Sequence, residues 1–208
     1  VGGSVRVAEQ DQSKLPDSVR LLLRSAMEVI LPVRLDQAST HWSVDGNSSA
    51  PSQLTISTGD HADRVEILPH ELNMRSIVGG AESAATRIAY QGVNLTIGTE
   101  GGDDSVTIRH SATLPPLLLY TGQGNDRIEL NLTQAGAALD NLRRIDGGEG
   151  IHDLLVVRDA PGNDLNLTIH NNKLLPTTLH APEIEVLELY GYDGDDRLVN
   201  DTAARAFF

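Results

Sequence analysis

The sequence predicts an all-β protein, a right-handed parallel β-helix (β-solenoid) of about seven coils of ~22 residues. Three observations predict it. A turn rich in glycine and aspartate recurs along the chain, an alternating apolar strand follows each turn, and aromatic residues make up only 3% of the composition. One strand–turn–strand unit cannot bury its apolar face, whereas stacked units bury theirs in one continuous core of Leu, Ile and Val.

The clearest copy of the repeat runs from Tyr120 to Leu132 and reads Y-T-G-Q-G-N-D-R-I-E-L-N-L. Glycines in its first half permit turn conformations that other residues rarely adopt. In its second half Ile128, Leu130 and Leu132 alternate with polar residues, which is the period of a half-buried strand. This copy therefore predicts a tight turn followed by a strand with one buried face.

Copies of the turn recur at related spacings. Five of them align on an aspartate, with gaps of 41, 22, 27 and 43 residues, at Asp63, Asp104, Asp126, Asp153 and Asp196. Because the long gaps are close to twice the short ones, we expect a degenerate copy inside each. The first is expected over Ile77 to Tyr90, with Thr86 in place of the aspartate, and the second around Asn171 and Leu174.

The string G-Q-G-N-D-R-I-E at Gly122 to Glu129 resembles the G-G-x-G-x-D-x-U-x repeat of the RTX, or haemolysin-type, calcium-binding proteins. Looser relatives of the string begin at Gly101, Gly147 and Asp193. The resemblance implies a secreted bacterial protein whose parallel β-roll binds calcium in stacked turns. In that family the repeats run in tandem, whereas here the motif occurs about once per coil. The pattern is closer to a parallel β-helix with an RTX-like turn along one edge.

The turn residues are the candidate calcium ligands. Calcium takes about six to eight oxygen ligands, and glycine-rich turns can supply backbone carbonyls beside carboxylates. The candidates are Asp103, Asp104, Gly122, Gly124, Asn125, Asp126, Glu149, Asp153, Asp193, Asp195 and Asp196. The alternative is that the Asp and Asn side chains only hydrogen-bond to the turn backbone and form a ladder.

The composition excludes several classes of function. A formal net charge of −13 argues against a nucleic-acid partner, because no basic stripe could displace counterions. No apolar run is long enough to span a bilayer, and cysteine is absent. The seven histidines show no zinc spacing, and no nucleophile elbow or phosphate loop is present. We therefore expect no enzymatic activity; the alternative is a carbohydrate-active β-helix enzyme resembling polysaccharide lyases or hydrolases.

Residues 1–45 do not fit the repeat and predict an N-terminal cap on a solenoid that spans 46–208 and continues beyond the chain end. One apolar stripe at helical spacing is formed by Val19, Leu22, Leu23, Ala26, Met27 and Ile30. This stripe predicts an amphipathic helix over about 16–30. We expect the helix to cover the open end of the stack, since bare strand edges invite aggregation.

Together these features predict a structural or adhesive module, part of a larger surface, matrix or fibre protein that is secreted or exposed on a bacterial cell. The expected partners are other copies, stacked head to tail into a filament, other domains of the same protein, or carbohydrate. Candidate glycosylation sites are the five N-x-S/T sequons at Asn47, Asn94, Asn131, Asn166 and Asn200.

Overall fold

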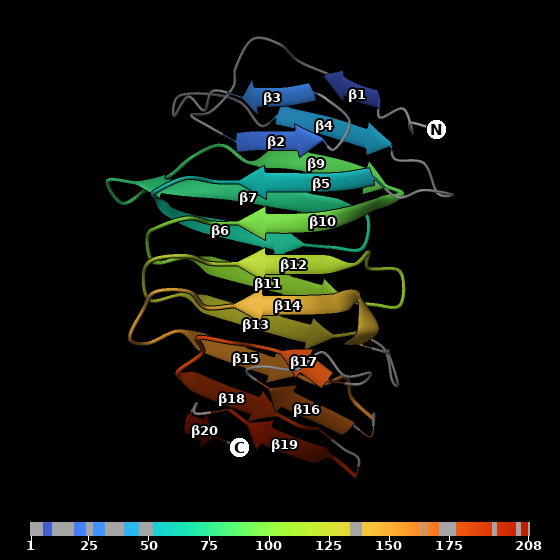
Figure 1. Cartoon of the computed structure of the whole chain (residues 1–208), viewed down its shortest axis with the longest axis vertical. Helices are drawn as coiled ribbons and strands as arrows, with labels where there is room; N and C mark the ends of the chain where they lie inside the picture. The colour runs from blue at the N-terminus through green and yellow to red at the C-terminus, as the bar shows by residue number, and fades with distance from the viewer. Residues whose placement is uncertain are drawn as a thin grey trace.

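The structure, a computed structural model, describes residues 52–133, 139–162, 164, 166–170, 178–192, 195–202 and 205–207. It also describes the backbone of four strands that precede residue 52. The described residues form twenty strands in three sheets, joined by turns and one 3₁₀ turn at Leu139–Asn141 (Figure 1). The predicted all-β class is therefore confirmed, as is the prediction that parallel pairing dominates the sheets.

The first sheet has eleven strands. In spatial order they are β1 (Arg6–Glu9), β4 (Thr40–Asp45), β9 (Thr86–Gln91), β7 (Glu71–Val78), β6 (Ala62–Ile67), β11 (Ser105–His110), β13 (Arg127–Leu132), β15 (Leu154–Arg158), β18 (Val186–Tyr190) and β20 (Arg205–Phe207), with β8 (Ala81–Glu82) beside β7. From β6 to β20 all strands of this order run parallel.

The second sheet has six strands and the third has three. The second contains β14 (Leu142–Asp146), β12 (Leu117–Tyr120), β10 (Val93–Gly98), β5 (Ser52–Ser57), β2 (Val19–Leu23) and β3 (Met27–Leu31). The third contains β17 (Thr178–His180), β16 (Asn166–His170) and β19 (Arg197–Asp201), with β17 beside β14. From β5 onward the chain passes repeatedly from the second or third sheet to the first, so successive passes lie one below another (Figure 1).

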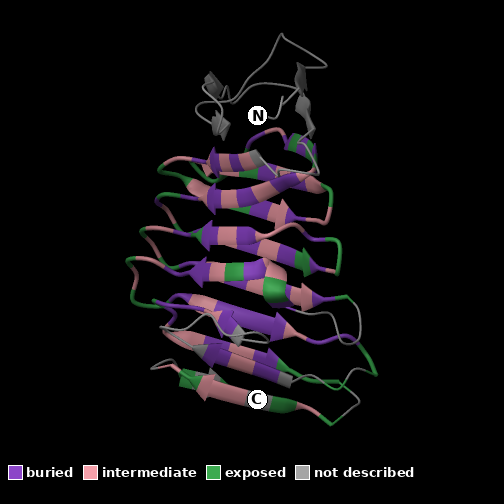
Figure 2. Ribbon diagram, turned by 45° about the vertical axis from the view of Figure 1, so that its right-hand side comes forward, coloured by how far each residue is buried: buried purple, intermediate pink, exposed green. Residues whose placement is uncertain are grey.

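The core lies between the sheets and consists of columns of like residues. Alternation along strands such as β10 and β13 places every second side chain inside, visible as alternating bands in Figure 2. Parallel pairing in register then puts equivalent side chains above one another. Two columns from the first sheet, all at most 5% exposed, are Val65, Val106, Ile128, Leu155 and Leu187, and Ile67, Ile108, Leu130, Val157 and Leu189.

The predicted N-terminal helix is wrong. The residues assigned to it form strands β2 and β3, which pair antiparallel from Val19↔Leu31 to Leu23↔Met27. Strand β2 also pairs antiparallel with β5, at Leu22↔Thr55 and Leu23↔Leu54. The physical reason is that β5 offers an edge of unpaired backbone groups, and a strand satisfies those groups whereas a helix cannot. The expected covering of that edge is present, but strands provide it.

The predicted degenerate copy over Ile77 to Tyr90 is also wrong. Strand β7 turns back antiparallel to β6, and β9 returns antiparallel to β7. Strands β7, β8 and β9 thus form an insertion within the first sheet on one side of β6, while on its other side β6 pairs directly with β11. The second expected copy, around Asn171 and Leu174, lies outside the described residues.

Among the residues that the structure describes, no helix is long and apolar enough to cross a bilayer.

Candidate functional site

The glycine- and aspartate-rich turns lie side by side along one edge of the stack, at the left in Figure 1. We call residues 58–63, 99–104, 121–126, 146–153 and 181–185 the turn edge. Backbone hydrogen bonds join neighbouring turns directly, for example Gln123 N to Glu100 O at 2.8 Å and Glu149 N to Gly122 O at 2.6 Å. The turns are therefore held to one another by backbone pairing like that of the strands.

Five acidic side chains form a column inside the turn edge, of which the four aspartates are buried and the glutamate is half-buried. Each carboxylate except that of Asp63 accepts a hydrogen bond from the backbone N–H of the preceding column member. The donor–acceptor distances are 2.7 Å from Asp63 N to Asp104 Oδ1, and 2.8 Å for Asp104 N to Asp126 Oδ1, Asp126 N to Asp153 Oδ1 and Asp153 N to Glu185 Oε2. We call Asp63, Asp104, Asp126, Asp153 and Glu185 the carboxylate column.

Burial makes this column electrostatically unusual. Its four aspartates are at most 2% exposed, and each has one carboxylate oxygen with no hydrogen-bond partner among the described residues. Burial raises the pKa of Asp104 to about 8 and that of Asp153 to about 6, and it raises the pKa values of Asp63 and Asp126 as well. No arginine or lysine forms a described ion pair with any of these four aspartates.

A column of threonines runs beside the aspartates. Thr58, Thr99 and Thr121 are buried, and each stands five residues before its aspartate. The Thr99 hydroxyl donates to Thr121 O at 2.8 Å, and the Thr121 hydroxyl donates to Gly147 O at 2.7 Å. The Thr58 hydroxyl donates to the Asp63 carboxylate. The sequence analysis missed this column, although the recurrence of T-x-x-x-x-D in three turns is visible in the sequence.

Glycine is required in the turns because neighbouring backbones approach closely. At Gly122, where φ is +93°, a Cβ would lie 1.9 Å from Glu100 O of the next turn. At Gly124, where φ is +143°, it would lie 2.0 Å from Gly102 O. A side chain at either position would separate the turns, so these two predicted ligand positions have a demonstrable packing role.

The other predicted ligands lie outside the buried column. Asp103, Asn125 and Glu149 are exposed; Asp103 Oδ1 accepts from Asn125 N at 2.9 Å, and Glu149 accepts from the Gln123 side chain at 3.1 Å. Asp195 donates its backbone N–H to Asp164 Oδ1 at 3.0 Å. Asp196 precedes β19 of the third sheet, and the column member that follows Asp153 is Glu185. Asp193 lies outside the described residues.

The side chains of the turn edge meet only part of what a cation site requires. The unpartnered oxygens of the column are hard, anionic donors of the kind that calcium prefers. In the described part of the chain, however, no three residues among His, Cys, Asp and Glu are grouped as a metal site. Side chains alone therefore do not form a calcium cage there, and turn carbonyls would have to supply the remaining ligands.

A polar recess of about 470 Å³ lies on the outer face of the first sheet, where the insertion joins the regular stack. We call it the outer-face recess. It is lined by Arg64 and Glu66 of β6, Asn73 and Arg75 of β7, Glu82 of β8, and Ser105 and Thr107 of β11. Two carboxylates and two guanidinium groups thus meet in one hollow. The spacing of the sequence repeats could not predict this recess, because it depends on the insertion, which brings β7 beside β6 and β8 beside β7.

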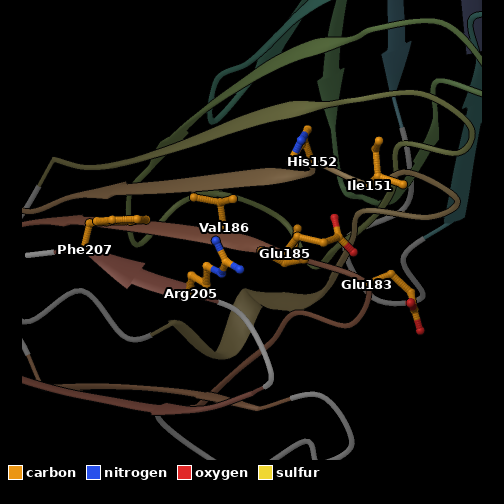
Figure 3. A pocket seen from close by; sticks show the side chains of 8 residues that line it. Ile151, His152, Glu183, Glu185, Val186, Arg205 and Phe207 are labelled. Carbon is orange, nitrogen blue, oxygen red and sulfur yellow. The ribbon is translucent and has the colours of Figure 1, made fainter.

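A second recess, of about 460 Å³, lies near the C-terminal end of the first sheet (Figure 3). Ile151 and Glu183 stand on one side of it and Phe207 on the other, with Glu185 and Arg205 between them. Ile151 and Phe207 are 74% and 57% exposed. This recess combines apolar and charged groups, and nothing in the structure shows what covers it.

Three predicted glycosylation sequons have described side chains. Asn94 on β10, Asn131 on β13 and Asn200 on β19 are all half-buried. Asn200 Oδ1 accepts hydrogen bonds from the backbone and hydroxyl of Thr202, at 3.1 and 2.7 Å. Asn166 lies in β16, and Asn47 is outside the described residues.

Comparison with known proteins gives no relative: no protein-family model, curated protein or solved structure matches the chain.

Proposed function

We propose that the chain is a structural or adhesive β-solenoid module, a section of a larger secreted or surface-exposed bacterial protein. The observation that supports it is the carboxylate column, in which each turn is tied to the next by a carboxylate and backbone N–H. Such bonds act between nearest neighbours, so every added pass extends the same core and the same turn edge. The right-handed winding of the solenoid is part of this proposal.

Surface exposure is the part of the proposal that a cell experiment tests. An antiserum raised against the chain should label intact source cells, and added protease should remove that label while a cytosolic marker survives. Labelling that requires cell lysis would overturn the proposed location, and with it the adhesive role.

Calcium binding along the turn edge is the second part of the proposal. The unpartnered, buried oxygens of Asp104, Asp126 and Asp153 support it, because a cation would offset the cost of ionising these buried carboxylates. We expect the melting temperature, followed by circular dichroism, to rise in about 5 mM calcium relative to excess chelator, since calcium would bind only the folded state. Magnesium at equal concentration is the control for ionic strength. Identical melts in calcium, magnesium and chelator would reduce the turn edge to a hydrogen-bonded ladder.

A carbohydrate-active enzyme is the second candidate, favoured by the outer-face recess. Glu66 and Glu82 would be its carboxylates, and Arg64 or Arg75 its basic group. Both carboxylates are engaged in ion pairs, Glu66 with Arg109 at 2.7 Å and Glu82 with Arg75 at 3.4 Å, which suits binding better than proton transfer. Release of reducing ends or unsaturated uronates from a polysaccharide panel, abolished in Glu66→Gln, would establish the enzyme. Turnover that survives this substitution would exclude the recess as its site.

A further inference from the structure

We propose that the outer-face recess binds a saccharide that carries carboxylate groups, such as an oligomer of uronic acids. This inference names a partner for the adhesive role proposed above. It rests on the recess itself, so its failure would leave the scaffold proposal intact.

The first argument is an unfavourable charge arrangement. Arg64 and Arg75 stand directly opposite each other on the antiparallel pair β6–β7, and both point outward. Like charges in directly opposed positions destabilise a sheet. Both arginines share the single carboxylate of Glu82, and Glu66 is already paired with Arg109. Counted with Arg109, which lies outside the lining of the recess, three arginines thus share two carboxylates, in a chain whose net charge is −13. The local surplus of positive charge suits an anionic ligand.

The second argument is an unsatisfied acceptor. Asn73 Oδ1 is buried beside the recess and has no hydrogen-bond partner among the described residues, while its Nδ2 makes only a long contact of 3.4 Å to Glu66. An unpaired buried amide oxygen is destabilising. A rotation of the Asn73 side chain toward the recess would let a ligand that donates a hydrogen bond satisfy this oxygen. Sulfate cannot do so because it only accepts, whereas a sugar hydroxyl both donates and accepts.

The third argument is the composition of the lining. The hydroxyls of Ser105 and Thr107 line the recess, and its lining includes no aromatic group. Peptide-binding grooves rely on apolar pockets for side chains, which this recess lacks. Hydroxyls, an amide and guanidinium groups instead match a ligand that carries hydroxyls and carboxylates together. The chemistry therefore favours a uronic acid saccharide over an acidic peptide or a free inorganic anion.

The test is a titration of the folded chain, followed by isothermal calorimetry at low ionic strength. The probes are trigalacturonate, its methyl ester, oligomers of mannuronate and glucuronate, and sodium sulfate. We expect at least one uronate oligomer to bind, and its methyl ester to bind about tenfold more weakly, because the ester removes the charge-assisted hydrogen bonds. Absence of binding by all three uronate oligomers up to about 10 mM, a free energy weaker than roughly −3 kcal/mol, would overturn the proposal. Equal binding of sulfate would also overturn it.

Variants then locate the site. Arg75→Gln should weaken binding about tenfold, whereas Arg143→Gln, which removes an exposed arginine from the second sheet, should leave it unchanged. Asn73→Leu should weaken binding while leaving stability to urea unchanged or higher, because it removes an unsatisfied buried oxygen. Equal effects of the two arginine substitutions would place the ligand elsewhere. If Asn73→Leu left the affinity unaltered, the Asn73 amide would have no role in recognising the ligand.

Discussion

Replacement of Asp104 by asparagine should make the stability of this protein less sensitive to alkaline pH. Asp104 is 2% exposed, its Oδ1 accepts from Asp63 N, and burial raises its pKa from 3.8 to about 8. The native state therefore keeps a proton that the unfolded state has released. The stability that this retained proton gives the folded chain is fully present below about pH 3.8 and is lost as the pH rises to about 8. The asparagine side chain would keep the acceptor oxygen without carrying an ionisable group.

The magnitude follows from linkage. Each pH unit between the unfolded and native pKa values changes the unfolding free energy by about 1.36 kcal/mol. Between pH 5 and pH 8, three pH units, ionisation of Asp104 thus lowers the unfolding free energy of the native chain by about 4 kcal/mol. Asp104→Asn should not show this loss, so its stability relative to the native chain should rise by about 4 kcal/mol over the same range. Urea unfolding in chelator, followed by circular dichroism at pH 5, 7 and 9, measures this difference.

Asp103→Asn is the matched control, since it makes the same chemical change at an exposed neighbour. We expect its stability difference from the native chain to change little with pH. A difference for Asp104→Asn that stays constant within about 1 kcal/mol from pH 5 to 9 would refute the reasoning, because Asp104 would then be ionised in the folded state.

Three further substitutions, and one control, test the packing of the stack by their effects on urea unfolding. Gly122→Ala places a Cβ 1.9 Å from a carbonyl oxygen of the neighbouring turn, and it should lower the unfolding free energy by more than about 3 kcal/mol. Gly162 also has a positive φ, but a Cβ there would meet nothing within 4 Å, so the control Gly162→Ala should lower the unfolding free energy by only about 1 kcal/mol. Equal losses would mean that backbone conformation, and not turn contact, requires the glycine. Thr121→Val removes a hydroxyl that donates to a neighbouring carbonyl and should cost about 1–3 kcal/mol, and a neutral result would show that this column is dispensable. Leu130→Ala, at a site with 0% exposure, should cost about 2–5 kcal/mol, and a loss below about 1 kcal/mol would contradict the buried column.

The sequence could not distinguish turns whose side chains bind a metal ion from turns whose side chains only form hydrogen bonds. Asp104 and Asp126 were correctly expected to lie in adjacent turns, since their 22-residue spacing matches one pass of the chain. Their spacing carries no information on whether a carboxylate faces a cation or a neighbouring backbone N–H, because the same turn geometry serves both. Glu185 was missed because no glycine-rich turn precedes it, although its strand V-L-E-L-Y carries the same alternation as the one after Asp126.

The sequence by itself determined the elements that depend on local periodicity. Alternation such as that of Ile128, Leu130 and Leu132 specifies a strand with one buried face, and the recurring turns specify that such strands stack. Tertiary structure decided the elements whose local signals are compatible with two states. The apolar runs over residues 19–23 and 27–31 fit a helical stripe as well as two strands, and the unpaired edge of β5 selects the strands. It likewise decided the antiparallel course of β7, and hence the outer-face recess, because pairing between strands depends on backbone groups that every residue shares.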